Sequence, residues 1–368
     1  MMAKIKTGEH RRAVLFVALA SIAVLSGCAS LKEGFDTGGL KDSAKAMQDA
    51  VGRFSEGRFQ GPEALEKELA TYDPFALVDA PPKVMVTVGP LDRWRLEDSR
   101  HNLHQERLSF PSVSPVRGGA PDEAVYYLYY RGELRGKKAI LWVPGYGVSD
   151  FAFLFIRRIF AAELDDNYAI LFYTLPGHLE RIRVGEKSGD GLLSADPETN
   201  LEMVQTVLGE LATGMTELRA RGVSSFSAWG GSMGAAFLLI LAERERFDHV
   251  ALMIPVLDWN SIMGNVAMEG IRARLAESGY PDSLVRRAYR TISPMYRIWN
   301  PGSTRYLIQY GRYDRLTPEA LTLAFAKARG IEALGYEESH ATILLSGRMF
   351  EDYRRFLDGL ATESSTVP

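Results

Sequence analysis

The segment 224–235, which reads SSFSAWGGSMGA, constrains the fold of this chain more than any other part of the sequence. A β-rich run leads directly into a glycine-rich turn, and an apolar helical run, AAFLLILAERE, begins immediately afterwards. Such a turn strains the backbone at Ser232, so the flanking positions must be glycine or small to avoid clashes with the strand and the helix. The segment therefore predicts a nucleophile turn at Ser232, and the alternative is a tight strand-to-helix connection in which the serine only caps the helix.

Short apolar runs alternate with longer amphipathic runs from Val84 onward. Strands are expected at 123–131, 138–143, 168–174, 224–229, 249–257, 304–310 and 331–337. Helices are expected at 150–164 and 197–219, and from near Met233, Pro318 and Ala341. Asp196 is well placed to cap the helix at 197–219, and Pro197 suits its first turn. This alternation predicts an α/β fold with a mostly parallel sheet and helices on both faces.

The chain divides into three parts by composition. Residues 28–83 are polar and predict a tether and an N-terminal helical arm, with short helices at 41–59 and 62–71. Residues 84–368 form the main domain. Within it, the long insertion at 258–302 contains helical stretches broken by glycine and proline, and we interpret it as a helical cap over the carboxyl edge of the sheet.

The first 27 residues read as an export signal. Basic residues among the first twelve positions precede an uncharged apolar run, 13–25, which is short for a membrane span. The run ends in LSGC, which resembles the bacterial lipobox. That resemblance implies lipidation of Cys28 and stable attachment through two or more lipid chains, and Ala29 after the cysteine favours the outer membrane. The alternative is an uncleaved membrane anchor with an incidental cysteine.

Composition excludes several other classes of function. The formal net charge is −3, which gives no basic footprint for nucleic acid. Cys28 is the only cysteine, so no intrachain disulfide can form. No cluster of histidine, cysteine and aspartate has metal-ligand spacing, and the turn GGSMG lacks the lysine of a phosphate-binding loop. We therefore expect neither a metal nor an organic cofactor.

A serine hydroxyl becomes a good nucleophile only when a neighbouring imidazole accepts its proton. Two of the six histidines follow Ser232 in the chain. His249 begins an expected strand and so lies at the wrong end for the active edge, which suggests a surface or packing role. His340 follows an expected strand and precedes an expected helix, which is the carboxyl-edge position a base needs. His340 is therefore the expected general base.

The acid that orients the imidazole is expected from the end of another strand. Asp314 follows the strand at 304–310 after a glycine turn, and Thr317 and Pro318 are suited to cap and open the next helix. Asp314 would accept the imidazole N–H and fix its tautomer. The alternative is that Asp314 only caps the loop, and Asp258, at the end of the preceding strand, is the reserve candidate.

Acyl transfer also needs hydrogen-bond donors for the oxyanion that develops during attack. The backbone N–H of Met233 is one candidate, because it follows the nucleophile at a helix amino terminus. The loop PGYG at 144–147 supplies the other, and the N–H of Tyr146 is its best donor. A glycine-rich turn at this place could also be only a connection.

The order PGYG, GGSMG, GRYDRLTP and SHAT resembles the α/β-hydrolase superfamily from about Val84 to the carboxyl terminus. The resemblance implies the α/β-hydrolase fold, the triad Ser232, Asp314 and His340, and a water-dependent acyl-enzyme cycle. Pro144 departs from the pattern, because many members have histidine before the oxyanion glycine. That departure leaves the oxyanion hole possible with a different detailed geometry.

The segment LPGH at 175–178, followed by Arg181 and Arg183, resembles the corresponding loop of hydrolases similar to the mammalian α/β-hydrolase-domain 18 group. His178 precedes Ser232, so it would break the superfamily order as a base, and we expect a loop hydrogen bond or a substrate contact instead. Arg181 and Arg183 are expected either to grip an anionic substrate group or to lie solvated on the loop.

Together these features predict a lipid-anchored serine hydrolase of the bacterial envelope that cleaves small-molecule or lipid carboxylic esters. An acyltransferase on the same scaffold is one alternative. A non-catalytic binding lipoprotein that keeps the fold without turnover is another. Peptides and cell-wall esters stay open as substrates, because the fold does not determine the reaction.

Overall fold

A computed structural model describes residues 59–360, apart from 82–84, 92–94, 97–101, 113–121, 149, 164, 187, 191 and 266–267. The expected signal peptide at 1–27, the lipidation site Cys28 and nearly all of the expected helix at 41–59 lie outside the described residues. In the part of the chain that is described, no helix is both long and apolar enough to cross a membrane.

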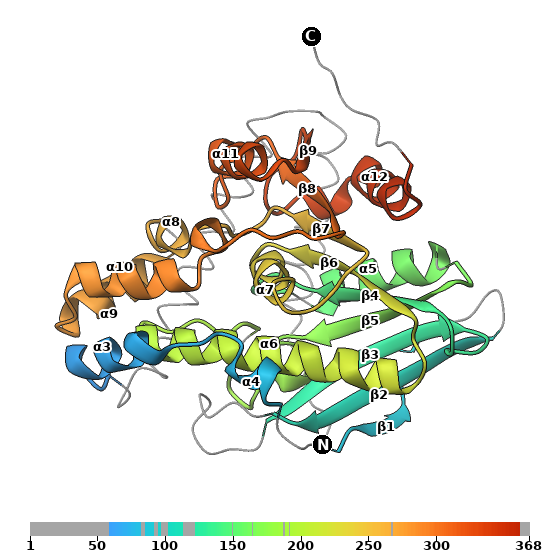
Figure 1. Ribbon diagram of the computed structural model, residues 1–368, viewed down its shortest axis with the longest axis horizontal. Helices are drawn as coiled ribbons and strands as arrows, with labels where there is room; N and C mark the ends of the chain where they lie inside the picture. The colour runs from blue at the N-terminus through green and yellow to red at the C-terminus, as the bar shows by residue number, and fades with distance from the viewer. Residues whose placement is uncertain are drawn as a thin grey trace, which may run out of the picture.

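A mixed β-sheet forms the centre of the molecule (Figure 1). Its order, among the described residues, is β1-β2-β3-β5-β4-β6-β7-β8-β9. The strands are β1 (Thr87–Pro90), β2 (Leu103–Pro111), β3 (Glu123–Arg131), β4 (Lys138–Val143), β5 (Tyr168–Thr174), β6 (Ser225–Gly231), β7 (His249–Met253), β8 (Arg305–Gly311) and β9 (Glu332–Tyr336). Pairing is antiparallel from β1 through β3 to β5 and parallel from β5 to β9, which confirms the mostly parallel sheet.

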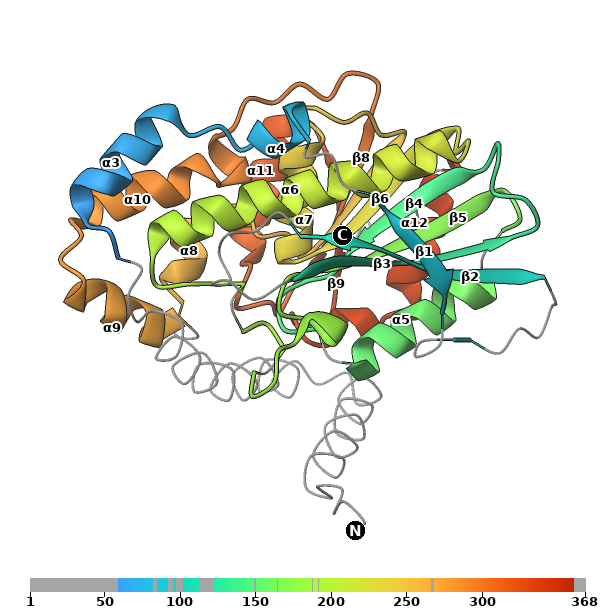
Figure 2. The same ribbon diagram turned by 90° about the horizontal axis from the view of Figure 1, so that it is seen from below.

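Helices cover both faces of the sheet, as predicted (Figure 2). One face carries α6 (Pro197–Ala220), α7 (Met233–Leu241) and α11 (Glu319–Arg329), and the other carries α5 (Asp150–Glu163) and α12 (Gly347–Leu357). Side chains alternate between the faces along a strand. In β3, Tyr126 and Leu128 join the core on the α6 side, whereas Tyr127 and Tyr129 join the core beneath α5.

The helix α6 begins as the sequence predicts. The side chain of Asp196 accepts a hydrogen bond from the Glu198 amide at 3.2 Å, and Pro197 occupies the first turn. One face of the helix is fully buried, and it consists of Leu201, Val204, Leu208, Leu211, Met215 and Leu218. Burial of this face, rather than helix propensity alone, stabilises a helix of 24 residues against the sheet.

The helix expected near Ala341 begins later, at Gly347. The Thr342 hydroxyl accepts a hydrogen bond from the Ser339 amide and donates one to Glu338, which holds the chain in a turn at this point. A short 3₁₀ helix, η4 (Ile343–Leu345), follows, and the Ser346 side chain then caps α12. Local side-chain hydrogen bonds, rather than the apolar pattern, therefore determine where this helix begins.

The insertion at 258–302 contains α8 (Trp259–Met263), α9 (Glu269–Glu277), α10 (Asp282–Thr291) and the 3₁₀ helix η3 (Pro294–Tyr296). The helices α8, α9 and α10, together with α3 (Pro62–Thr71), lie beyond one end of the sheet (Figure 1), and α3 and α10 contact α6. The helix α3 has the bounds that the sequence predicts. It packs on α10 and α6, and the Gly61 amide donates to the Tyr280 hydroxyl at 3.2 Å. A four-residue helix, α4 (Ala76–Asp79), follows α3 and also packs on α6.

Candidate active site

Ser232 occupies the sharp turn between β6 and α7, with φ of 51° and ψ of −115°. A positive φ is uncommon for a serine and stores strain in the backbone. The neighbouring glycines permit this close packing. A Cβ atom at Gly230 would lie 2.8 Å from the backbone nitrogen of Ala235, and one at Gly234 would collide with the carbonyl oxygens of Val143 and Pro144. The turn therefore requires glycine at these positions, as the sequence predicts.

The structure brings three predicted side chains together at the carboxyl edge of the sheet. The Ser232 hydroxyl donates to Nε2 of His340 over 3.1 Å. Nδ1 of the same ring donates to Oδ2 of Asp314 over 2.8 Å. Ser232 follows β6, Asp314 follows β8 and His340 follows β9, so three parallel strands deliver the three groups to one edge.

The Asp314 carboxylate is held by its own loop. Its Oδ1 accepts the amides of Leu316 and Thr317, each at 2.8 Å, and its Oδ2 accepts the Thr317 hydroxyl at 2.6 Å. Its side chain is completely buried. The sequence suggested that Thr317 caps α11, and this is wrong. The Thr317 hydroxyl donates to Asp314 instead, and Pro318 occupies the N-cap position of α11 without a side-chain hydrogen bond. The loop instead fixes which carboxylate oxygen faces His340.

Asp258, the reserve acid, has a different role. It caps α8, where Oδ1 accepts the Asn260 amide at 3.0 Å, and its other oxygen accepts the Tyr296 hydroxyl at 3.3 Å. His340 pairs with Asp314, so the geometry selects Asp314 between the two.

His249 is a packing residue at the start of β7, as expected. Its ring lies edge-on to Phe356, with 5.2 Å between ring centroids, and its Nδ1 is 3.4 Å from the Ser227 hydroxyl. Burial lowers the pKa of His249, and the positive charge of Arg305 lowers it further. Ser227 and His249 pair at the opposite end of β6 and β7 from Ser232, which makes them natural controls.

The two predicted oxyanion donors flank the nucleophile. Met233 is the first residue of α7, and Tyr146 lies in the loop after β4. A Cβ atom at Gly145 would lie 3.0 Å from the Ser232 Cβ, so this loop packs directly on the nucleophile. Neither the Tyr146 amide nor the Met233 amide donates to an acceptor within the described residues. An amide that donates to a substrate oxygen must lack such an acceptor, so the arrangement of the described residues is compatible with this role for both N–H groups.

His178 makes the loop hydrogen bond that was one of its two expected roles. The ring is fully buried. Its Nε2 accepts the Gly147 amide at 2.8 Å, and its Nδ1 lies 2.9 Å from the Pro176 carbonyl oxygen. The segment LPGH thus contacts the loop PGYG, which carries the Tyr146 amide.

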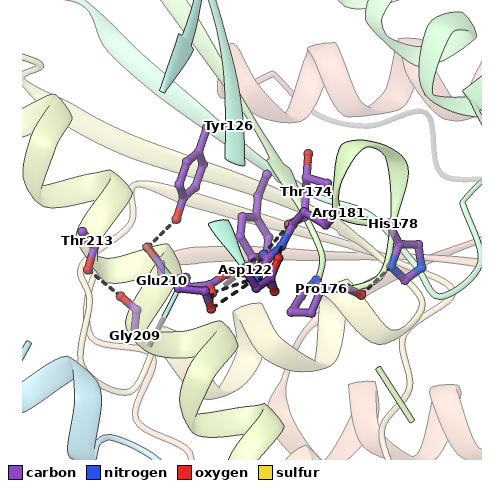
Figure 3. Close-up of polar contacts among 11 residues, drawn as sticks. Asp122, Tyr126, Thr174, Pro176, His178, Arg181, Gly209, Glu210 and Thr213 are labelled. Atoms are coloured by element: carbon purple, nitrogen blue, oxygen red, sulfur yellow. Dashed lines mark hydrogen bonds and ion pairs between the residues drawn. The ribbon is translucent and has the colours of Figure 1, made fainter. Parts of the chain in front are cut away.

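Arg181 does not lie solvated on the loop, so that expectation for it is wrong. Its ion pairs within the protein give no support to the other expected role, a contact with an anionic substrate group. Arg181 is buried and forms ion pairs with Glu210 of α6 and with Asp122, each at 2.7 Å (Figure 3). It also donates to the Thr174 carbonyl oxygen at 2.9 Å. Burial lowers the pKa of Arg181, but the charges of Glu210, Tyr173 and Asp122 and the hydrogen bond to Glu210 together raise it well above its ordinary value. Of Arg183, the structure shows its backbone amide donating to Glu186 at 3.2 Å.

Sequence reasoning missed this buried cluster, although a signal for it exists. Glu210 stands among apolar residues at helical spacing, after Met203 and Val207 on the same side of α6. A carboxylate on a buried helix face must find a partner, because an unpaired buried charge is very costly. The partner Arg181 comes from a loop 29 residues earlier, which periodicity within the helix does not reveal.

A nucleophile, a base, an orienting acid and two backbone amides beside the nucleophile form the set of groups that acyl transfer requires. In the described part of the chain, no group of three or more histidine, cysteine, aspartate or glutamate side chains is placed to hold a metal ion.

Neither a protein-family model nor a curated protein sequence matches this chain. Among solved structures, it is similar to an acetyl xylan esterase from Paenibacillus sp. R4, at 13% identity and a TM-score of 0.57. That match covers 82% of this chain and 96% of the esterase. An acylaminoacyl peptidase from Pyrococcus horikoshii matches at 14% identity with a TM-score of 0.49, over 71% of this chain and 42% of the peptidase. The likeness to the acetyl xylan esterase, with the sheet order, shows that the chain has the α/β-hydrolase fold.

Proposed function

We propose that this protein is a serine hydrolase that cleaves carboxylic esters through an acyl-enzyme intermediate. The observation that carries the proposal is the continuous chain of hydrogen bonds from Ser232 through His340 to Asp314. A serine at a strained turn, bonded to an imidazole whose other nitrogen bonds a buried carboxylate, is the arrangement that activates a hydroxyl for attack.

In the first half of the proposed cycle, Ser232 Oγ attacks the acyl carbon while Nε2 of His340 takes the hydroxyl proton. Asp314 accepts Nδ1–H throughout and stabilises the imidazolium. The Tyr146 and Met233 amides hold the oxyanion of the tetrahedral intermediate. When this intermediate collapses, the bond between the acyl carbon and the alcohol oxygen breaks, and His340 returns its proton to the departing alcohol.

In the second half, water attacks the acyl-serine ester. His340 removes one proton from the water, the acyl–Oγ bond breaks, and the proton returns to Ser232 as the carboxylic acid leaves. His340 must be neutral at the start of each half, so turnover should rise with pH as the imidazole loses its proton. The same geometry would serve an acyltransferase if an alcohol replaced water in this step.

We further propose that the protein acts at the bacterial envelope, held by lipid chains on Cys28, with the outer membrane as its site. The lipobox-like LSGC supports this proposal, as does the uncharged run before it. Release of the protein by detergent, but not by high salt, together with loss of membrane association in Cys28→Ser, would support the anchor. A Cys28→Ser protein that stays in the membrane fraction would exclude it.

The activity is best tested with p-nitrophenyl esters of graded acyl length, on the full chain purified in detergent. Because the similar Paenibacillus structure is an acetyl xylan esterase, acetyl esters belong in the panel. Ser232→Ala should abolish hydrolysis, whereas Ser227→Ala, which changes a buried serine on the same strand, should retain it. Equal activity in the two variants would contradict the proposal.

Product analysis separates hydrolysis from transfer. With an activated ester and candidate alcohols present, a hydrolase should release mainly free acid. An excess of transfer product over free acid would favour the acyltransferase alternative on the same scaffold.

A further inference from the structure

We propose that His178 is a positioning residue for the oxyanion loop: it holds the PGYG turn so that the Tyr146 amide points toward the oxygen that becomes negatively charged. The inference rests on the proposed function, because it names the residue that aims one of its two amide donors. His178 itself touches neither Ser232 nor His340 among the contacts that the structure shows.

The hydrogen bonds of His178 select one tautomer. A carbonyl oxygen can only accept, so Nδ1 donates its proton to the Pro176 oxygen, 2.9 Å away. Nε2 then has a lone pair and accepts the Gly147 amide at 2.8 Å. The neutral ring thus joins two loops that are far apart in sequence, and only the Nδ1–H form makes both bonds.

The bond to Gly147 acts directly on Tyr146. The amide nitrogen of Gly147 belongs to the same planar peptide group as the Tyr146 carbonyl, so fixing that N–H fixes the plane that follows Tyr146. Gly147 has a φ of 73°, a conformation that glycine adopts without strain, and it has no side chain that would restrict the backbone of the turn. Rotation of this turn would move the Tyr146 N–H away from the substrate oxygen.

The Tyr146 side chain packs between His178 and Gly189. Its ring lies edge-on to the His178 ring, with 6.0 Å between the centroids. A Cβ atom at Gly189 would come within 2.7 Å of the tyrosine ring, so Gly189 packs flat against it. The Gly189 amide in turn donates to the Gly177 carbonyl at 2.9 Å, next to His178. The loops at 145–148, 175–178 and 188–189 therefore interlock around Tyr146.

The backbone of His178 is bonded to Arg181, which belongs to the buried ion-pair cluster with Glu210 and Asp122 (Figure 3). The Arg181 amide donates to the His178 carbonyl at 2.8 Å, and the guanidinium is paired with Glu210 of α6. Leu179, between them, has a φ of 51°, which a leucine adopts only when its surroundings enforce it. The strain at Leu179 indicates that the position of His178 is imposed by the fold.

The matched test compares His178→Leu with His178→Gln. Gln can place an amide oxygen near the position of Nε2 and accept the Gly147 N–H, whereas Leu has no acceptor. Loss of one well-aimed oxyanion donor costs about 10²-fold to 10³-fold in kcat. We expect His178→Leu to lose about 10²-fold in kcat with KM changed less than about threefold, and His178→Gln to recover at least about tenfold of that loss.

The control is His249→Leu, because His249 is a packing imidazole at the other end of the strands, and this variant should keep kcat within about threefold. Amide hydrogen exchange at Tyr146 and Gly147 gives a readout independent of turnover. Exchange at Gly147 should be faster in His178→Leu than in the wild type and in His178→Gln. If His178→Leu does not fold, His178→Asn, which can bond Pro176 but is too short to accept from Gly147, takes its place.

The outcomes separate the two proposals. A wild type that hydrolyses no ester would overturn the proposed function, and Gly147 exchange would then decide whether His178 holds the loop. An active wild type whose His178→Leu variant keeps its kcat would overturn the positioning role alone. So would equal losses of kcat in the Leu and Gln variants.

Discussion

At the residue scale, the site depends on three side chains that the fold collects from positions 232, 314 and 340. Each residue was predictable from its place after a strand, because the carboxyl ends of parallel strands meet at one edge of a sheet. The contacts that hold Asp314 in its loop were not predictable. The sequence suggested that Thr317 caps a helix, whereas its hydroxyl holds the Asp314 carboxylate. Short polar side chains serve either purpose, and only the loop geometry decides between them.

Asp314→Asn should lower kcat by about 10⁴-fold, because an amide in this place favours the wrong imidazole tautomer. Asp258→Asn is the matched control, since Asp258 caps α8 whereas Asp314 is the carboxylate that pairs with His340. It should change kcat little. Steady-state hydrolysis of one ester by both variants checks the assignment. A large loss of kcat in Asp258→Asn with an unchanged kcat in Asp314→Asn would reverse it.

Thr317→Val should reduce kcat by about tenfold while KM changes little. The substitution keeps the shape of the side chain but removes the hydroxyl that donates to Oδ2 of Asp314 at 2.6 Å. A charge-assisted hydrogen bond of this kind contributes about 1.5–3 kcal/mol. The two Oδ1 bonds from the backbone remain, so the carboxylate should stay in place with a less fixed orientation. An unchanged kcat in Thr317→Val would mean that the backbone amides alone orient Asp314.

At the element scale, the strands with the strongest apolar pattern were predicted with the bounds the structure gives, namely β3, β4 and β5. β1 and β2 were missed because they contain few buried residues and so show little apolar pattern. β1 has no buried residue, and β2 has three, near its end. β7 stops at Met253, four residues before the expected end. Ile254 has a φ of 44°, and the proline after it lacks an N–H for the ladder.

Glu210→Gln should destabilise the fold by about 3–5 kcal/mol, because it leaves the buried Arg181 guanidinium with less negative charge to pair. Glu210 also accepts the Tyr173 hydroxyl, so a second buried donor is affected. Glu217→Gln, on the outer part of the same helix, is the control and should change the free energy of unfolding by less than about 0.5 kcal/mol. Urea unfolding of both variants measures the difference. Equal stabilities would show that the cluster contributes no net stability.

At the scale of the whole molecule, the amino-terminal arm and the insertion meet at the start of α6, beside a group of carboxylates. Glu198 is buried there, and neither of its carboxylate oxygens has a hydrogen-bond partner among the described residues. Burial, followed by the charges of Asp196, Glu68 and Glu202, raises the pKa of Glu198 to about 7. Burial and the neighbouring carboxylates Glu202 and Asp196 raise the pKa of Glu68, on α3, to about 7 as well.

These two pKa values predict that stability falls as pH rises. Glu68 and Glu198 bind protons more tightly in the folded than in the unfolded chain, so the folded state is favoured most below about pH 4.5. That advantage is lost progressively as pH rises from about 4.5 through about 7. Urea unfolding at pH 5 and pH 8 should show the loss, and Glu198→Gln should make it smaller. An unchanged pH dependence in Glu198→Gln would contradict the assignment to this carboxyl.

The central claim is that Ser232 is a nucleophile activated by His340, and covalent labelling tests it most directly. The full chain in detergent is incubated with a fluorophosphonate, and the product is read by intact mass and by peptide mapping. We expect one adduct per chain, on Ser232, in the wild type and in Ser227→Ala. We expect almost none in Ser232→Ala and slow labelling in His340→Ala. A wild type that stays unmodified, or an adduct on another residue, would contradict the account.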